Sequence, residues 1–280
     1  IMRAGGIVHA RTATPEFSAA FCTQSRLWGA TRNPWNPEFT PGGSSGGTAA
    51  SLAAGTSTIA SGSDIAGSIR NPAGCCGLVG YKPPYGRNSD DPPFNLDFYC
   101  HTGPLARNVS DAIVLQNVMC GPHPKDLASL RPKLRLPTDY PPIKDWKIAF
   151  SMDLGFFEVD PDVQKNTLKA LDVFRDLGAT VEEVDIGWDH RVLDAGLAYL
   201  SHIFGAYMAT YLKDHADKMT SYVRQWAEEA QKSTAAEFLH TLEVANEMYA
   251  TVGPLLEKYQ VLVCPTNALP AVPADFDHSR

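Results

Sequence analysis

Two glycine-rich segments, each carrying serine, hold the residues whose types and spacing could do chemistry. Residues 43–47 read GSSGG and residues 62–70 read GSDIAGSIR, so Ser68 follows Ser44 by 24 positions. The small residues before Ser68 allow successive backbone N–H groups to point into one cavity. An oxyanion hole needs such preorganised donors around a developing negative charge. The second segment therefore predicts a site that stabilises an oxyanion.

The first segment also matches the GxSxG pattern of a nucleophile elbow, with Ser45 as the nucleophile. That motif needs a strand that runs straight into a sharp turn. Residues 33–41 precede it and contain Pro34, Pro37 and Pro41, which disfavour a central strand. The sequence also lacks a GxxxxGK[ST] phosphate loop, a GxGxxG loop, an SxxK pair and an HExxH metal motif.

The glycines are concentrated around these two segments. Residues 42–86 hold 11 of the 22 glycines but only three charged residues, Asp64, Arg70 and Lys82. A flexible linker could share this composition, but alanine, leucine, isoleucine and valine are interleaved throughout. The distribution therefore indicates buried, tightly turned backbone.

The elements that must position these segments follow from hydrophobic periodicity and capping residues. Short strands are predicted at residues 6–9, 147–151, 180–186 and 261–264. Helices are predicted at residues 48–54, 110–119 and 160–177, and residues 194–213 and 219–258 are expected to be mainly helical. The strand, helix and strand over residues 147–186 favour an α/β fold with helices packed on a sheet.

Composition argues against several classes of protein. The formal net charge of −7 disfavours a nucleic-acid partner, which needs clustered basic charge. The six cysteines form no CxxC pair and no cluster with histidine at the spacing of a zinc site. This pattern is typical of reduced, buried cysteines in a cytoplasmic protein. Residues 195–212 lack charged side chains but contain glycine, histidine and helically spaced aromatic residues. We therefore expect a buried or pocket-lining helix there and no membrane span.

Three stretches of the sequence resemble the amidase signature family. They are residues 41–50 (PGGSSGGTAA), 63–73 (SDIAGSIRNPA) and 76–83 (CGLVGYKP). Shorter pieces at residues 12–17 (TATPEF), 29–35 (GATRNPW) and 103–107 (GPLAR) look like neighbouring family segments. The resemblance is dense over residues 5–120 and weaker over 145–186. A motif of this length, with its serine spacing intact, is highly specific.

The resemblance implies a serine mechanism. Ser68 matches the nucleophile, which attacks the amide carbonyl and forms an acyl-enzyme. Ser44 matches the serine that relays protons between the nucleophile, the base and the leaving amine, and the family's peptide bond before it is cis. The oxyanion hole corresponds to backbone N–H groups of Ile65, Ala66 and Gly67, together with that of Ser68. No metal and no other cofactor is implied.

The remaining motif positions have supporting roles by the same resemblance. Asp64 and Arg70 are expected to brace the loop, and Ser63 stands where the family often has threonine. The full supporting set is Gly43, Ser45, Ser63, Asp64 and Arg70.

Two departures from the family pattern stand out. Ala66 replaces the usual glycine, which predicts a φ below zero at this position. The family's catalytic base is a lysine located well upstream of residues 12–17, whereas no lysine precedes Lys82 in this sequence. Lys82 itself matches a structural position and not the base. We expect the chain to be a fragment that lacks the lysine segment, and a catalytically dead pseudoenzyme is the alternative.

The resemblance implies a mixed, twisted β-sheet core sandwiched by helices, within the α/β class. It implies a single domain over residues 1–280, truncated at both ends. The signature core lies at residues 5–120, and a variable substrate-pocket region lies at 121–260.

The implied function is hydrolysis of carbon–nitrogen bonds in linear amides, with esters and carbamates left open. The expected partner is a small-molecule amide with an apolar or aryl acyl part, because residues 195–212 are aromatic and uncharged. The alternatives are a glutaminase-type subunit of a tRNA amidotransferase and a non-catalytic interaction protein. A homodimer is left open, since nothing in the sequence determines the oligomeric state.

Overall fold

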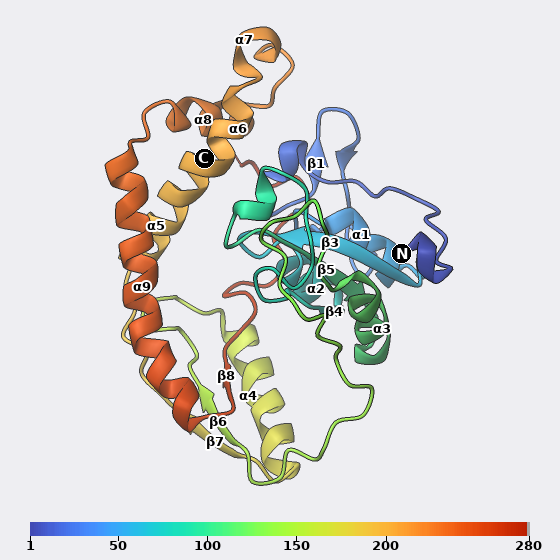
Figure 1. Cartoon of the computed structure of the whole chain (residues 1–280), viewed down its shortest axis with the longest axis vertical. Coiled ribbons are helices and arrows are strands. Elements are labelled where there is room, and N and C mark those ends of the chain that lie inside the picture. Colours follow the sequence, from blue (N-terminus) through green and yellow to red (C-terminus); the bar gives the residue numbers. More distant parts are fainter. Residues whose placement is uncertain (279–280) are drawn as a thin grey trace. The chain divides into compact units, whose positions relative to one another are not determined.

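The computed structural model describes residues 1–278 (Figure 1). These residues form two compact units. The first consists of Ile1–Tyr140 with Ala271–His278, and the second consists of Pro141–Pro270. Both units combine strands with helices, which confirms the predicted α/β class. The assignment of residues 5–120 and 121–260 to a core and a pocket region of one domain stays a prediction.

The main sheet of the first unit is antiparallel, with the strand order β3-β5-β4 (Figure 1). Its strands are β3 (Ile59–Asp64), β5 (His101–Ala106) and β4 (Val79–Gly80), and a separate pair is formed by β1 (Gln24–Ser25) and β2 (Gly29–Ala30). The first residue of β3 pairs with the last of β5, and Asp64 pairs with His101, so the two strands pair along their whole length. The loop that carries Ser68 therefore begins at the end of a fully paired strand.

Helices of the first unit begin directly after each serine segment. They are α1 (Gly46–Ala53) and α2 (Arg70–Cys76), followed later in the chain by α3 (Val109–Met119); short 3₁₀ turns are η1 (Met2–Ala4), η2 (Glu16–Ser18) and η3 (Phe94–Leu96). One buried cluster joins α1, α2 and β5, and its members are Ala49, Leu52, Ile69, Ala73, Cys76 and Leu105. Burial of these side chains drives the packing that brings the two serine segments together.

The second unit contains a parallel sheet with the order β7-β6-β8, beside α4 (Figure 1). The elements are β6 (Lys147–Phe150), α4 (Pro161–Asp176), β7 (Thr180–Glu183) and β8 (Val261–Val263). Asp160 caps α4, since its side chain accepts a hydrogen bond from the Asp162 N–H, and Pro161 occupies the first turn. The predicted strand–helix–strand unit is thus confirmed.

The rest of the second unit is mainly helical, as predicted, and is divided into shorter helices. Residues 194–213 are not one helix: α5 (Arg191–Leu200) is followed by a π-helical turn, η4 (Ser201–Gly205), then by α6 (Ala206–Ala209) and α7 (Leu212–His215). The mainly helical residues 219–258 form two helices, α8 (Ser221–Ala230) and α9 (Ala235–Lys258). A capping box starts α9, because Thr234 and Glu237 each accept a hydrogen bond from the other's backbone N–H.

The strand predicted at residues 6–9 is wrong. These residues lie outside any strand, and Ile7 and Val8 are exposed. A strand needs a paired neighbour, and within residues 1–278 no strand pairs with this segment. In that same part of the chain, no helix is long and apolar enough to cross a bilayer.

Candidate active site

The two serine segments meet directly. Ser44 and Ser45 lie at the start of α1 and are buried, whereas Ser68 lies between β3 and α2 and is partly exposed. The Ser45 backbone N–H donates to the Ser68 carbonyl oxygen at 3.2 Å. The Ser45 hydroxyl donates to the carbonyl oxygen of Ser63 at 3.4 Å. These contacts bring the loop of Ser44 beside the loop of Ser68, and the expectation that these two serines share one site stays a prediction.

The peptide bond between Gly43 and Ser44 is cis, as the resemblance implies. Thr23, which is fully buried, holds the loop on both sides of this peptide. Its hydroxyl donates to the Gly42 carbonyl at 2.9 Å and accepts from the Gly46 N–H at 3.1 Å. Sequence reasoning missed Thr23, because it lies outside the quoted motifs and acts through backbone groups about 20 positions away.

Gly43 is packed against backbone on several sides. A Cβ at this position would lie 2.8 Å from the Ala20 carbonyl oxygen, 2.8 Å from the Phe21 carbonyl carbon and 2.9 Å from the Cys22 nitrogen. Backbone atoms cannot rotate away as a flexible side chain can. A side chain at position 43 must therefore displace the Ser44 loop or residues 20–22.

We expect Gly43→Ala to lower the stability of the first unit by about 1–3 kcal/mol, the usual range for an overpacked site. The displaced loop should also lower, at least tenfold, the rate of the amide hydrolysis that the family resemblance implies. Urea unfolding and steady-state kinetics measure the two effects. The matched control is Gly196→Ala in α5, where a Cβ meets nothing within 4 Å and stability should be unchanged or increased. Wild-type stability and rate in Gly43→Ala would contradict the packing argument.

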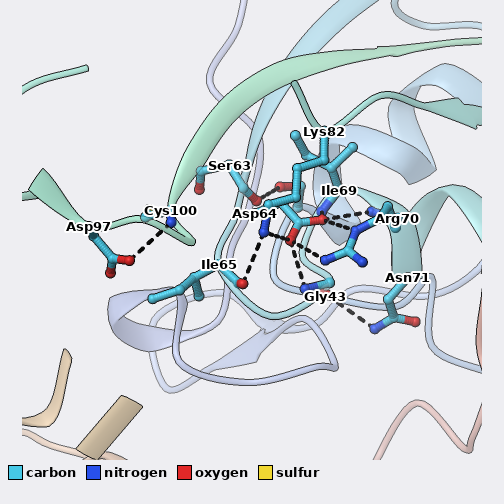
Figure 2. Close-up of polar contacts among 12 residues, drawn as sticks. Gly43, Ser63, Asp64, Ile65, Ile69, Arg70, Asn71, Lys82, Asp97 and Cys100 are labelled. Carbon is cyan, nitrogen blue, oxygen red and sulfur yellow. Dashed lines mark hydrogen bonds and ion pairs between the residues drawn. The ribbon is translucent and has the colours of Figure 1, made fainter. Parts of the chain in front are cut away.

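Asp64 organises the loop between β3 and α2 (Figure 2). Its fully buried carboxylate accepts hydrogen bonds from the backbone N–H groups of Gly67 (2.8 Å), Ile69 (3.1 Å) and Arg70 (3.3 Å). The Arg70 guanidinium donates to both carboxylate oxygens, Nε at 2.9 Å and Nη2 at 2.8 Å. The prediction that Asp64 and Arg70 brace the loop agrees with these contacts.

Lys82 adds a second cation to the same carboxylate. Its Nζ lies 3.2 Å from Asp64 Oδ1 and donates to the Ile65 carbonyl oxygen at 3.1 Å. Burial alone would raise the pKa of Asp64, but the hydrogen bond from Arg70 and the charges of Lys82 and Arg70 outweigh it and hold the pKa well below its usual range. Burial lowers the pKa of Lys82, and the charge of Asp64 opposes this shift only in part.

The backbone donors assigned to the oxyanion hole differ in how they are used. The Gly67 N–H donates to Asp64 Oδ1, so it is engaged within the loop, and its assignment to the oxyanion hole stays a prediction. Within residues 1–278, the N–H groups of Ile65, Ala66 and Ser68 have no protein acceptor. Gly67 has a φ of 118°, which favours glycine, whereas Ala66 is not among the residues with positive φ.

Two further features of the described chain bear on the choice of a catalytic centre. Across residues 1–278, no three His, Cys, Asp or Glu side chains gather as a group that could hold a metal ion. A cavity of about 670 Å³ lies in the second unit, where Met152, Phe157, Gln164 and Leu269 are among its lining residues. It contains none of the predicted site residues.

Known proteins resemble this chain over nearly its whole length. A family model described as Amidase matches residues 1–279. The acylamidase of Rhodococcus erythropolis is 31% identical over 278 residues, which cover 96% of this chain and 57% of that protein. A glutamyl-tRNA(Gln) amidotransferase subunit of Methanosarcina barkeri is 38% identical over 195 residues, which cover 66% of this chain and 40% of that protein.

A solved structure of the amidase signature family also resembles this chain. The crystal structure of a bacterial aryl acylamidase of the amidase signature family aligns with a TM-score of 0.86 and 29% identity, over 93% of this chain and 56% of that one. The chain thus spans about half the length of the relatives it matches. The family model matches nearly the whole sequence, and the serine loops have the expected cis peptide. The chain belongs to the amidase signature family.

Proposed function

We propose that this chain supplies the serine machinery of an amidase that hydrolyses carbon–nitrogen bonds in acyl amides. The observation that carries the proposal is the direct contact between the Gly43–Ser44 loop and the Ser68 loop, in which the Ser45 N–H donates to the Ser68 carbonyl. Asp64 fixes the second loop from a buried position, which preorganises its backbone donors before substrate binds.

The proposed reaction uses the roles that the family resemblance implies for Ser68 and Ser44. Ser68 Oγ bonds to the amide carbonyl carbon while its proton passes to Ser44, and the carbonyl electron pair moves onto oxygen. N–H groups of the loop stabilise that oxyanion. When the carbonyl reforms, the C–N bond breaks and the amine leaves with a proton returned through Ser44. Water then adds to the acyl-enzyme, which releases the carboxylic acid and regenerates Ser68.

The base that accepts the proton from Ser44 is assigned to no residue of this chain. Lys82 is excluded from this role by its contacts, because its ammonium group is held between Asp64 and the Ile65 carbonyl. Since the chain spans about half the length of its relatives, the activity of the whole protein is part of the proposal.

An acyl amide with an apolar or aryl acyl part is the proposed substrate. It is supported by the 31% identity to an acylamidase over 96% of the chain and by the TM-score of 0.86 to an aryl acylamidase. A glutaminase-type activity is the second candidate, since the amidotransferase subunit of Methanosarcina barkeri is 38% identical over 195 residues.

A comparison of two substrates separates the candidates. With the full-length protein that contains this chain, we expect an aryl acylamide to be hydrolysed at least 100-fold faster, by kcat/KM, than glutamine is converted to glutamate and ammonia; the threshold is about 2.7 kcal/mol in transition-state binding. Faster release of ammonia from glutamine would establish the second candidate. No turnover of either substrate, with no labelling of Ser68 by a fluorophosphonate, would overturn both and indicate a pseudoenzyme.

A further inference from the structure

We propose that Asn71 is a positioning residue that holds the peptide before Ser44 in register with the Ser68 loop. The inference rests on the proposed function, because it concerns the geometry between the relay serine and the nucleophile. Asn71 lies in α2, three positions after Ser68. No role was predicted for it from the sequence.

The side chain of Asn71 reaches the Ser44 loop. Its Nδ2 donates to the Gly43 carbonyl oxygen at 3.1 Å (Figure 2). The same Nδ2 also donates to the Phe21 carbonyl oxygen at 3.0 Å. The Gly43 carbonyl belongs to the cis peptide that ends at the Ser44 nitrogen. Both amide hydrogens of Asn71 therefore act on backbone at or beside that peptide, since residues 20–22 also pack against Gly43.

The main chain of Asn71 is tied to the other loop. Its backbone N–H donates to the Gly67 carbonyl oxygen at 2.6 Å, directly before Ser68. One residue thus connects the peptide of the relay serine, through its side chain, to the peptide of the nucleophile, through its main chain. This connection is independent of the contact between the Ser45 N–H and the Ser68 carbonyl.

A contact at the side-chain oxygen of Asn71 orients its side-chain amide group. The Cys75 Sγ donates to Asn71 Oδ1 at 3.3 Å. Burial raises the pKa of the Cys75 thiol to about 11, so the proton that makes this contact stays on sulfur at neutral pH. With Oδ1 facing a donor, the amide places its two N–H bonds toward the carbonyls of Gly43 and Phe21.

Asparagine is matched to this position by its hydrogen-bonding groups. An aspartate of the same shape has no donor and would place a carboxylate against two carbonyl oxygens. An alanine leaves both carbonyls without this partner. In either variant the Ser44 peptide loses its link to α2, and a displacement of about 1 Å at a reacting group can lower a rate by about 100-fold.

The test compares Asn71→Asp and Asn71→Ala with a matched control in the full-length protein. The control is Asn117→Asp, because Asn117 makes the same type of contacts elsewhere, with Nδ2 donating to the Leu136 carbonyl at 2.9 Å and Oδ1 accepting from the Leu136 N–H at 2.8 Å. Active sites are counted by labelling Ser68 to completion with a fluorophosphonate. Rates are then expressed per labelled site, so that loss of folded protein does not lower them.

We expect kcat per labelled site to fall about 10- to 100-fold in both Asn71 variants, with KM changed less than about threefold. The rate of Ser68 labelling should fall in parallel, and Asn117→Asp should retain the wild-type kcat per site. The inference is overturned if either Asn71 variant keeps the wild-type kcat per site, or if Asn117→Asp loses as much. Ser68→Ala separates failure of the proposed function from failure of the Asn71 inference. An active Ser68→Ala enzyme would overturn the proposed function itself. An inactive Ser68→Ala enzyme, together with wild-type rates in the Asn71 variants, would overturn only the inference about Asn71.

Discussion

Replacing Ser68 by alanine is expected to lower kcat for amide hydrolysis by about 10⁴-fold or more, with little change in stability. Loss of a nucleophile removes the covalent pathway, and in serine hydrolases the residual rate comes from binding and the oxyanion hole alone. Ser68 is partly exposed, and its carbonyl, which accepts from the Ser45 N–H, is unchanged by the substitution. The fold of the loop should therefore survive.

Three measurements on Ser68→Ala make this prediction specific. Hydrolysis of an aryl acylamide should be lost, fluorophosphonate labelling should disappear, and the urea midpoint should stay near that of the wild type. The matched control is Ser61→Ala, which removes an exposed hydroxyl from β3, the strand that leads into the loop. A Ser68→Ala enzyme that retains more than about a tenth of the wild-type rate would show that another group performs the attack.

Much of the site could be predicted from the sequence, because its key residues lie in two continuous motifs. The serine spacing and the glycines around Ser44 and Ser68 placed both loops, and the contact between the Ser45 N–H and the Ser68 carbonyl agrees with them. The second unit was predictable for a different reason. Asp160 and Pro161 mark the start of α4 by capping, and Gly178, at a φ of 91°, follows its end.

The features of the fold and of the candidate site that could not be predicted depend on contacts between residues distant in sequence, which produce no periodic pattern in the sequence. Thr23 and Asn71 each act through one side chain on backbone carbonyls that are distant in sequence, so neither spacing nor composition indicates them. The strand expected at residues 6–9 failed because strand formation depends on a paired neighbour and not only on local propensity. The sequence does not indicate the π-helical turn at Ser201–Gly205 either, because its residues have the apolar periodicity of an ordinary helix.

Asp64 gives the largest expected effect on stability. Its carboxylate is fully buried and satisfies three backbone N–H groups as well as Arg70 and Lys82. In Asp64→Asn the charge is lost, and the new NH₂ group is a donor facing other donors. Removing one partner of a buried ion pair costs about 3–5 kcal/mol. The lower end of this range applies here, because the Arg70 side chain is 47% exposed. We expect a loss of this size in the free energy of unfolding, together with slower hydrolysis, because the loop that carries Ser68 loses its brace.

The pH dependence provides an independent check on the same group. The pKa of Asp64 is lowered in the folded protein, whereas the unfolded chain takes up a proton near its ordinary value of about 3.9. Between these two pKa values the unfolded state binds more protons than the folded state. The contribution of Asp64 to the free energy of unfolding is therefore fully present above the pKa of the unfolded state, and it falls as the pH decreases toward the pKa of the folded state. Asp64→Asn should remove this contribution, so its urea midpoint should decline less than that of the wild type between pH 7 and about pH 3.5.

The exposed Asp139→Asn is the matched control and should retain both the wild-type midpoint at pH 7 and the wild-type acid response. Equal free energies of unfolding for Asp64→Asn and the wild type, within about 1 kcal/mol, would mean that Arg70 and Lys82 hold the loop without the carboxylate. An unchanged acid response in Asp64→Asn would instead assign the acid sensitivity to other carboxylates. The two results together decide whether one buried charge both stabilises the first unit and shapes the loop that presents Ser68.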